Sequence, residues 1–389
     1  MISPRSLLDV SSNQLAFNSY IKPLVNIESL LALYFLMFIF GFTTQEGYLF
    51  YNEYRALQII LLIVIGFIAS IYQRRTISKG ELVFFALLMI GSLVWAQPAI
   101  IITEFLLIYL LYLSFTFLKY HQLASKLLVV LSITLFIQFP FALWDYVSTG
   151  HYAAIWYPLE WNIRVYDSYF LVVSIFAVWF YLTNQPYRYL YLLFLFLALL
   201  AILLDGGRSA TIAYTVLITI VSIGYSSVRW QLIATYLTSW LSYLSLSYFA
   251  SFNNDDTTLA VVRESSSGRI DIWMNALQCW SRDPIIGCGF YQLEQYPNLP
   301  AHPHNLYVQV LSETGLAGFG LLTYILILVF KRIDWTQTYG YFIMAAFLAI
   351  GVESFFSGVH IYAVTQLLLL WLLVFLLKNP AFNNAHRLP

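Results

Sequence analysis

One stretch of the chain carries residue types suited to proton transfer beside an anion. It runs from His302 to Gly318 and reads His-Pro-His-Asn-Leu-Tyr-Val-Gln-Val-Leu-Ser-Glu-Thr-Gly-Leu-Ala-Gly. The proline pre-sets φ for a helix start, so His304 is expected at or beside a helix N-terminus. The partial positive charge at such an end favours a neutral imidazole, which can accept a proton. His304 is therefore the candidate general base.

Two arginines stand where a phosphate or diphosphate could bind. Arg208 follows Gly206 and Gly207, which permit a close backbone approach, and the amides of the next helix start point outward. Arg269 opens an apolar pattern at 270, 273, 274, 277 and 280, which predicts an amphipathic helix along the membrane surface. The alternatives are a tight turn with a solvated Arg208 and a purely supporting role for Arg269.

Several other polar residues are weaker candidates for the same site. Gln138, beside Pro140, could contact a head group, although a helix–helix hydrogen bond is the favoured explanation. Glu353 lies near the outer end of the apolar run 336–355 and could line the cavity that holds this site. The remaining candidates are neighbours of the residues above or lie in the same loop: Arg263, His302 and Asn305.

The elements that position these residues follow from the composition. The chain has 389 residues, of which 60% are hydrophobic, 19% aromatic and 10% charged. A soluble domain of this composition could not hydrate its surface, so the sequence predicts an all-α polytopic membrane protein. The formal net charge is +0 at pH 7, which suggests no nucleic-acid partner.

Apolar runs of about 20 residues predict about twelve transmembrane helices. We expect one integral membrane domain over 1–389, with a large outer loop at 251–304 that contributes to the active site. No small-residue cleavage site follows the first run, so no cleaved signal peptide is expected. The expected spans are 27–43, 54–72, 80–97, 99–118, 123–145, 168–183, 187–204, 209–227, 229–250, 305–330, 336–355 and 359–377.

Basic residues predict the orientation. With the N-terminus inside, most of the 19 Lys and Arg residues, including every lysine, fall on the cytoplasmic side. Both termini are then cytoplasmic and the long loop is outside. Every outer cation is an arginine, the residue suited to bidentate phosphate recognition. Positive-inside selection against lysine is the alternative explanation. Two cysteines, Cys279 and Cys288, lie in this loop, and we expect free thiols rather than a disulfide.

Other chemistries lack their patterns in the sequence. No thiol or carboxylate cluster has metal-ligand spacing around His302 and His304, and Asp255-Asp256 is not an Asp-x-Asp pair. Neither a G-x-S-x-G elbow nor a Walker A sequence occurs. We therefore expect no metal and no cofactor. The remaining set is a general base, arginines and a membrane environment, which suits transfer from an activated lipid carrier.

Three segments resemble the O-antigen ligase family. They are Ser267-Gly-Arg-Ile-Asp-Ile-Trp, Pro284-Ile-Ile-Gly-Cys-Gly, and His304-Asn305 with nine residues before Gly315-Leu-Ala-Gly318. The last meets the family pattern His-[Asn/Ser/Gln]-x9-Gly-x-x-Gly at every position. Twelve spans with one large periplasmic loop between spans nine and ten also fit this family, as does a GT-C-like fold.

The resemblance implies a metal-independent, inverting glycosyltransferase of the bacterial inner membrane. It would move a glycan from undecaprenyl diphosphate to lipid A-core at the periplasmic face, with His304, Arg269 and Arg208 as its functional residues. O-antigen polymerases and protein O-oligosaccharyltransferases share the loop and remain alternatives, although the short segment after the last span favours the ligase. A flippase for the same lipid-linked glycan is the alternative of another class; such transporters often show repeated halves, which this sequence lacks.

Overall fold

The computed structural model describes the chain in several stretches. They are scattered positions between 128 and 148, then 163–183, 187–253, 269–289, 293, 303–331, 333, 335, 338–357 and 369. These residues form helices and turns with no strand among them, which agrees with the all-α prediction. Predictions that fall on Gln138, Arg263, His302, the termini and the spans before 163 or after 357 lie outside the described residues.

Seven long helices lie within the described stretches, and their ends match the predicted runs to within a few residues. Three regions are long and apolar enough to cross a membrane, namely Arg188–Asp205, Leu306–Lys331 and Tyr339–Phe356. The total of twelve spans stays a prediction. The helices are α8 Ile163–Leu182, α9 Arg188–Asp205, α10 Arg208–Gly224, α11 Arg229–Asn253, α12 Arg269–Trp280, α13 Leu306–Lys331 and α14 Thr338–Phe356.

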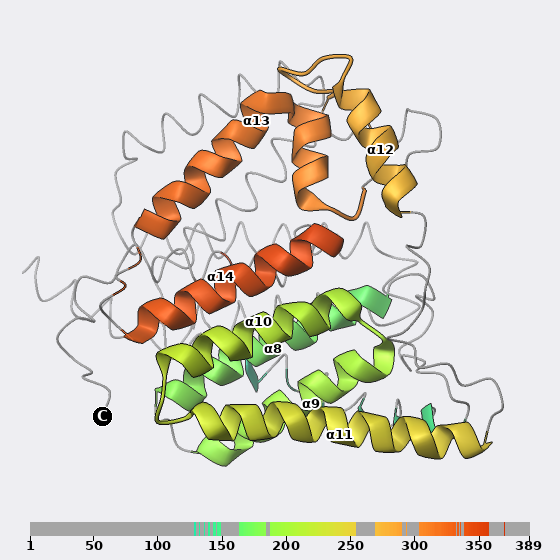
Figure 1. The fold of residues 1–389 in the computed structure, drawn as a ribbon, viewed down its shortest axis with the longest axis vertical. Coiled ribbons are helices and arrows are strands. Elements are labelled where there is room, and N and C mark those ends of the chain that lie inside the picture. Colours follow the sequence, from blue (N-terminus) through green and yellow to red (C-terminus); the bar gives the residue numbers. More distant parts are fainter. Residues whose placement is uncertain are drawn as a thin grey trace, which may run out of the picture.

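Helices α8 to α11 and α14 form a bundle of roughly aligned neighbours (Figure 1). The most extensive pairings join α8 with α9 and α10 with α14. Two side-chain hydrogen bonds link neighbouring helices to α9. The Tyr214 hydroxyl of α10 donates to the Leu195 carbonyl at 2.9 Å, and Ser239 Oγ of α11 donates to the Phe196 carbonyl at 3.3 Å. Helices in a membrane associate through such packing and polar contacts rather than through the exclusion of water.

The pairing of α10 with α14 is antiparallel. Gly224 at the end of α10 lies directly against the Tyr341 side chain near the start of α14, with no room for a Cβ between them. At about 1.5 Å per residue, the sixteen steps back to Arg208 and the fifteen steps on to Phe356 cover nearly equal lengths. The start of α10 therefore lies at the same end of the bundle as the last turn of α14.

Helix α13, predicted as one span over 305–330, is interrupted at Gly315. This residue has φ 63° and ψ −163°, a conformation that is essentially restricted to glycine. In Figure 1 the two segments of α13, 306–314 and 316–331, run in clearly different directions from the bend. The broken helix is therefore a sharp elbow that carries its first segment away from the direction of the second.

The loop 284–289 makes the hydrogen bonds that the interrupted helix cannot make. The amides of Cys288 and Gly289 donate to the carbonyls of Ser312 and Glu313 at 2.8 and 3.1 Å. In return, the amides of Leu316 and Ala317 donate to the carbonyls of Pro284 and Ile285 at 2.9 and 3.1 Å. Irregular backbone at membrane depth is tolerated where protein partners satisfy it in this way.

Two glycines and a disulfide hold the loop on the elbow. Gly287 has φ +74° and its Cα lies against the backbone of α13 at Glu313 and Gly315, so a side chain there would clash with that backbone. Cys279 at the end of α12 and Cys288 in the loop form a disulfide with a Cα–Cα distance of 6.1 Å. The expectation of two free thiols is thus wrong, because the elbow brings the loop back beside α12.

The elbow predicts a contrast between two glycines of the same helix. Gly315→Ala should destabilise the protein by at least about 2 kcal/mol, since it combines a disallowed φ with overlap on the Ile285 carbonyl. Gly320→Ala is the matched control, because nothing lies within 4 Å of a Cβ at Gly320 and alanine favours the helix. Thermal unfolding of the purified protein in detergent measures both. Equal melting temperatures would contradict the structural role of Gly315.

Candidate functional site

His304 lies immediately before the first turn of α13 in a left-handed conformation, with φ 55°. The next residue, Asn305, is fully buried and caps the helix, because its Oδ1 accepts from the amides of Tyr307 and Val308 at 2.9 and 3.0 Å. The sequence prediction of a histidine beside a helix N-terminus is confirmed. Asn305 was expected as a secondary site residue, and its capping bonds give it a structural role as well.

Helix α12 fixes the backbone just before His304. Trp273 Nε1 donates to the Pro303 carbonyl at 3.0 Å, and the Trp273 ring packs edge-on against Phe355 of α14 at 5.7 Å between centroids. From the first turn of α13, the Tyr307 ring contacts Phe355 at 5.9 Å and its hydroxyl donates to the Gly351 carbonyl at 3.2 Å. These contacts hold the start of α13 on the last turns of α14.

Arg269 is held at the same place from the start of α12. Its Nη1 donates to the Phe356 carbonyl at 2.6 Å, a favourable position for a cation at a helix C-terminus. Arg269 and Trp273 are four residues apart and share one face of α12. One residue of this face thus contacts the end of α14, while the other contacts the backbone beside His304. The two candidates His304 and Arg269 therefore belong to one cluster.

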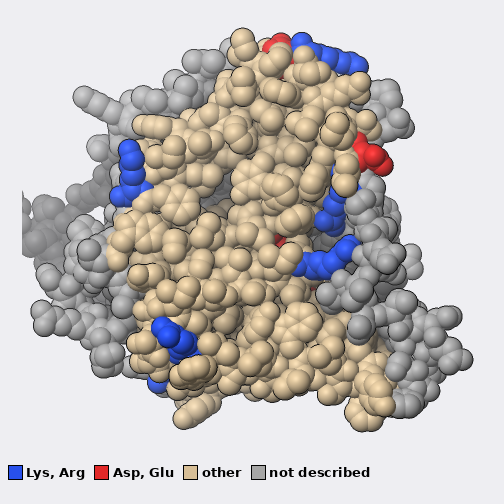
Figure 2. All heavy atoms as spheres, viewed as in Figure 1, with Lys and Arg blue, Asp and Glu red and all other residues tan. Residues whose placement is uncertain are grey.

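Arg208 lies at the same end of the bundle, where the pairing of α10 with α14 places it. It is the first residue of α10 and is exposed, and Gly207 just before it lies against the Asp167 carboxylate. Gly206 ends α9 in a left-handed conformation with φ 74°, and this reverses the chain sharply enough to begin α10 two residues later. The antiparallel pairing then sets Arg208 beside the last turn of α14. Basic side chains gather where the ends of α10, α12 and α14 meet (Figure 2).

The electrostatics of this end favour an anion. The N-termini of α10, α12 and α13 meet there, and each carries a partial positive charge in addition to the two guanidinium groups. The C-termini of α9 and α14 oppose them, and the Phe356 carbonyl at the end of α14 already accepts a hydrogen bond from Arg269. An arginine at the positive end of a helix dipole, as Arg208 is at the start of α10, suits phosphate oxygens.

Sequence reasoning missed two buried carboxylates near the cluster. Asp167 is 2% exposed and its carboxylate lies directly against Gly207, where any side chain would collide with it. Glu313 is 2% exposed and accepts from Gln309 Nε2 at 3.1 Å inside the first segment of α13. Glu353, which the sequence did suggest, is fully buried one turn before Phe356. The available signal was an ionisable residue within an apolar run, which marks function by default in membrane proteins.

The structure thus brings Arg269, His304 and Asn305 together through shared contacts, and the helix pairing carries Arg208 to the same end. In the described stretches, no three His, Cys, Asp or Glu side chains lie together as metal ligands would. The absence of a metal remains an expectation.

The described residues define a class: an all-helical protein with helices apolar enough to cross a membrane and with two arginines and a histidine at one end of its bundle. Residues 192–323 match the family model described as O-antigen ligase. The resemblance to the O-antigen ligase family is confirmed over that segment. Members of the family are glycosyltransferase-like ligases and polymerases, so the match supports an enzyme of that general kind with a lipid-linked glycan donor. No curated protein matches the chain.

The left-handed His304 predicts a separation of stability from activity. His304→Gly and His304→Ala should both abolish glycan transfer, because each removes the imidazole. The glycine variant should be about 1 kcal/mol more stable than the alanine variant, since glycine accepts φ 55° without a Cβ clash. Thermal unfolding and a transfer assay on the same preparations test this. An active glycine variant would mean that His304 serves only the backbone geometry.

Proposed function

We propose that the chain is an O-antigen ligase. It transfers a glycan from undecaprenyl diphosphate to a sugar hydroxyl of lipid A-core, at the periplasmic face of the bacterial inner membrane and without a metal or other cofactor. The observation that carries this proposal is the cluster at the end of α14. There the Arg269 guanidinium donates to the Phe356 carbonyl, while Trp273 one turn later holds the backbone beside His304.

The two arginines hold the diphosphate in this mechanism. The bond from Arg269 Nη1 to the Phe356 carbonyl fixes the plane of the guanidinium at the end of α14, beside the backbone that carries His304. Arg208 approaches from the start of α10, where the positive end of the helix dipole also favours an anion. The lipid tail of the donor extends between the apolar helices.

His304 activates the acceptor. Its imidazole removes the proton from the acceptor hydroxyl, and the hydroxyl oxygen forms a bond to the anomeric carbon as the bond from that carbon to the diphosphate breaks. Attack opposite the leaving group inverts the anomeric configuration. The diphosphate departs on its polyprenyl chain, and the arginines stabilise the charge that grows on it.

Asn305 supports the same step. Its Oδ1 is consumed by the helix cap, whereas its Nδ2 is buried without a hydrogen-bond partner among the described residues. A buried donor of this kind is costly unless a ligand accepts from it. In the proposed complex an oxygen of the donor or acceptor sugar fills that role.

The acceptor assay tests the function directly. Purified protein in detergent, supplied with a lipid-linked glycan, should transfer it to lipid A-core and neither to a second lipid-linked glycan nor to a pilin. Product on the second glycan-lipid would identify a polymerase, and product on the pilin a protein transferase. Absence of product on all three acceptors would favour a flippase. His304→Ala supplies the blank that separates enzymatic transfer from background.

The arginines should behave differently from their neighbours in the same assay. Arg208→Ala and Arg269→Ala should each lower turnover by about a hundredfold or more, the usual cost of losing a preorganised charge donor. Arg282→Ala, an exposed arginine just after α12, is the matched control and should stay within about twofold. His302→Ala should also have a small effect. Full activity of either the Arg208 or the Arg269 variant would remove the mechanism.

A further inference from the structure

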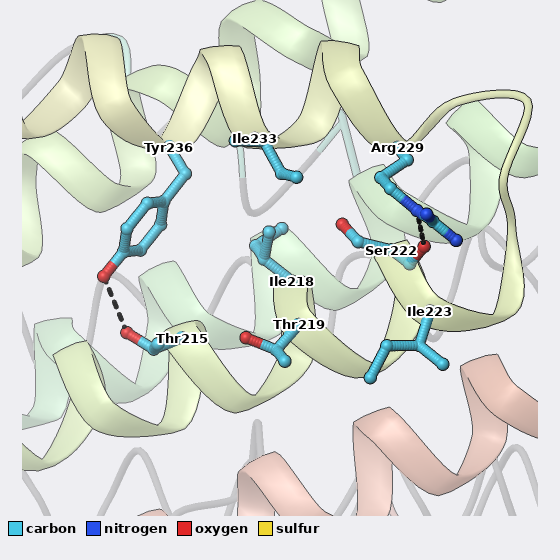
Figure 3. A pocket seen from close by; sticks show the side chains of 8 residues that line it. All are labelled: Thr215, Ile218, Thr219, Ser222, Ile223, Arg229, Ile233 and Tyr236. Atoms are coloured by element: carbon cyan, nitrogen blue, oxygen red, sulfur yellow. Dashed lines mark hydrogen bonds between the residues drawn. The ribbon is translucent and has the colours of Figure 1, made fainter.

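A cavity of about 360 Å³ lies between α10 and α11, and the proposed reaction makes no use of it. It is lined mainly by apolar side chains, with one cation at its end (Figure 3). Its lining comprises Thr215, Ile218, Thr219, Ser222, Ile223, Arg229, Ile233 and Tyr236.

The cavity lies toward the end of the bundle opposite to Arg208. Ser222 is fourteen residues along α10 from Arg208, which corresponds to about 21 Å. The turn from α10 to α11 has the exposed residues Ser226 and Ser227, and Trp230 beside Arg229 is 75% exposed. A polar turn with an adjacent exposed tryptophan is typical of a membrane–water interface. The cavity therefore opens near the leaflet opposite to the proposed transfer site.

Arg229 is prepared to bind an anion there. Its Nε donates to the Ser222 carbonyl at 2.8 Å, which orients the guanidinium along the end of α10 (Figure 3). No other hydrogen bond of this side chain is found among the described residues, so the terminal nitrogens can donate to a phosphate.

Ser222 gives the second indication of a ligand. It is 5% exposed, and its Oγ has no hydrogen-bond partner among the described residues. Other hydroxyls of these helices bond back to a carbonyl four residues earlier, as Thr211 and Thr215 do. Figure 3 shows the Ser222 hydroxyl pointing into the space between α10 and α11. A buried hydroxyl without a partner is costly, and a ligand oxygen would satisfy it.

The rest of the cavity suits a hydrocarbon chain. Ile218, Ile223 and Ile233 line it (Figure 3). The hydrogen bond between the Tyr236 hydroxyl and Thr215 Oγ1, at 3.0 Å, closes its far end. We propose that this cavity binds an anionic glycerophospholipid, with its phosphate on Arg229 and Ser222 and the upper part of one acyl chain between α10 and α11.

Lipid retention measured by native mass spectrometry tests the proposal independently of glycan transfer. Wild-type protein in a mild detergent should retain one phosphatidylglycerol at least about tenfold more tightly than Arg229→Gln, with a smaller loss for Ser222→Ala and partial recovery in Arg229→Lys. Ile218→Trp, which fills the cavity and leaves the arginine in place, should also lose the lipid. Arg188→Gln is the control, because Arg188 lies at the same end of the bundle over the Tyr181 ring and outside the cavity.

Each other outcome overturns the lipid assignment. Unchanged phosphatidylglycerol retention in both Arg229→Gln and Ile218→Trp would exclude this cavity as the binding site. Displacement of the lipid by millimolar inorganic phosphate would identify a simple anion site. Preferential retention of a polyprenyl phosphate or of zwitterionic phosphatidylcholine would assign the cavity to another lipid. Melting temperatures of all variants establish that the proteins compared are folded.

Discussion

The chain can bend at Gly315 because a second segment supplies the hydrogen bonds that the bend removes. Four backbone bonds link loop 284–289 to the residues on both sides of Gly315. An unsatisfied backbone group in a lipid environment costs several kcal/mol, so the elbow and the loop must form together. Because of the elbow, the segment 306–314 runs in a different direction from the segment 316–331. The start of α13 can therefore pack on the last turns of α14, where Trp273 of α12 bonds the backbone beside His304.

The structure gives a physical reason for the spacing in the pattern His-[Asn/Ser/Gln]-x9-Gly-x-x-Gly. Asn305 is the cap that begins α13 and Gly315 is the break that ends its first segment, so the nine residues between them set the length of that segment. Gly318 packs against the Thr314 hydroxyl, which leaves no space for a Cβ there. A change in the spacing would rotate His304 away from α14 or move the break off its partner loop. The spacing in the pattern is therefore required by the fold as well as by the proposed site.

The sequence allowed some of this to be predicted, for identifiable reasons. Apolar runs near 20 residues gave α9 and α14 almost to the residue, and proline followed by histidine and asparagine located the start of α13. The contact between loop 284–289 and the elbow leaves no comparable signal, because two irregular segments carry no periodicity that would pair them. The disulfide of Cys279 with Cys288 depends on that contact and was missed with it. Asp167 was missed because it directly precedes the predicted run 168–183, whereas α8 begins at Ile163 and buries it.

The two arginines of the proposed site are held in different ways, and this bears on how such a centre can work. Arg269 donates a hydrogen bond to the Phe356 carbonyl. It therefore links α12 to α14 as well as contributing its charge to the proposed site. Arg208 is exposed at the start of α10, and the nearby Gly207 lies against the buried Asp167. A charge fixed by the fold costs little reorganisation when a diphosphate departs, whereas an exposed one can follow the leaving group. Loss of Arg269 would disturb the position of α12 and hence the Trp273 contact beside His304. Loss of Arg208 would weaken the binding of the diphosphate directly.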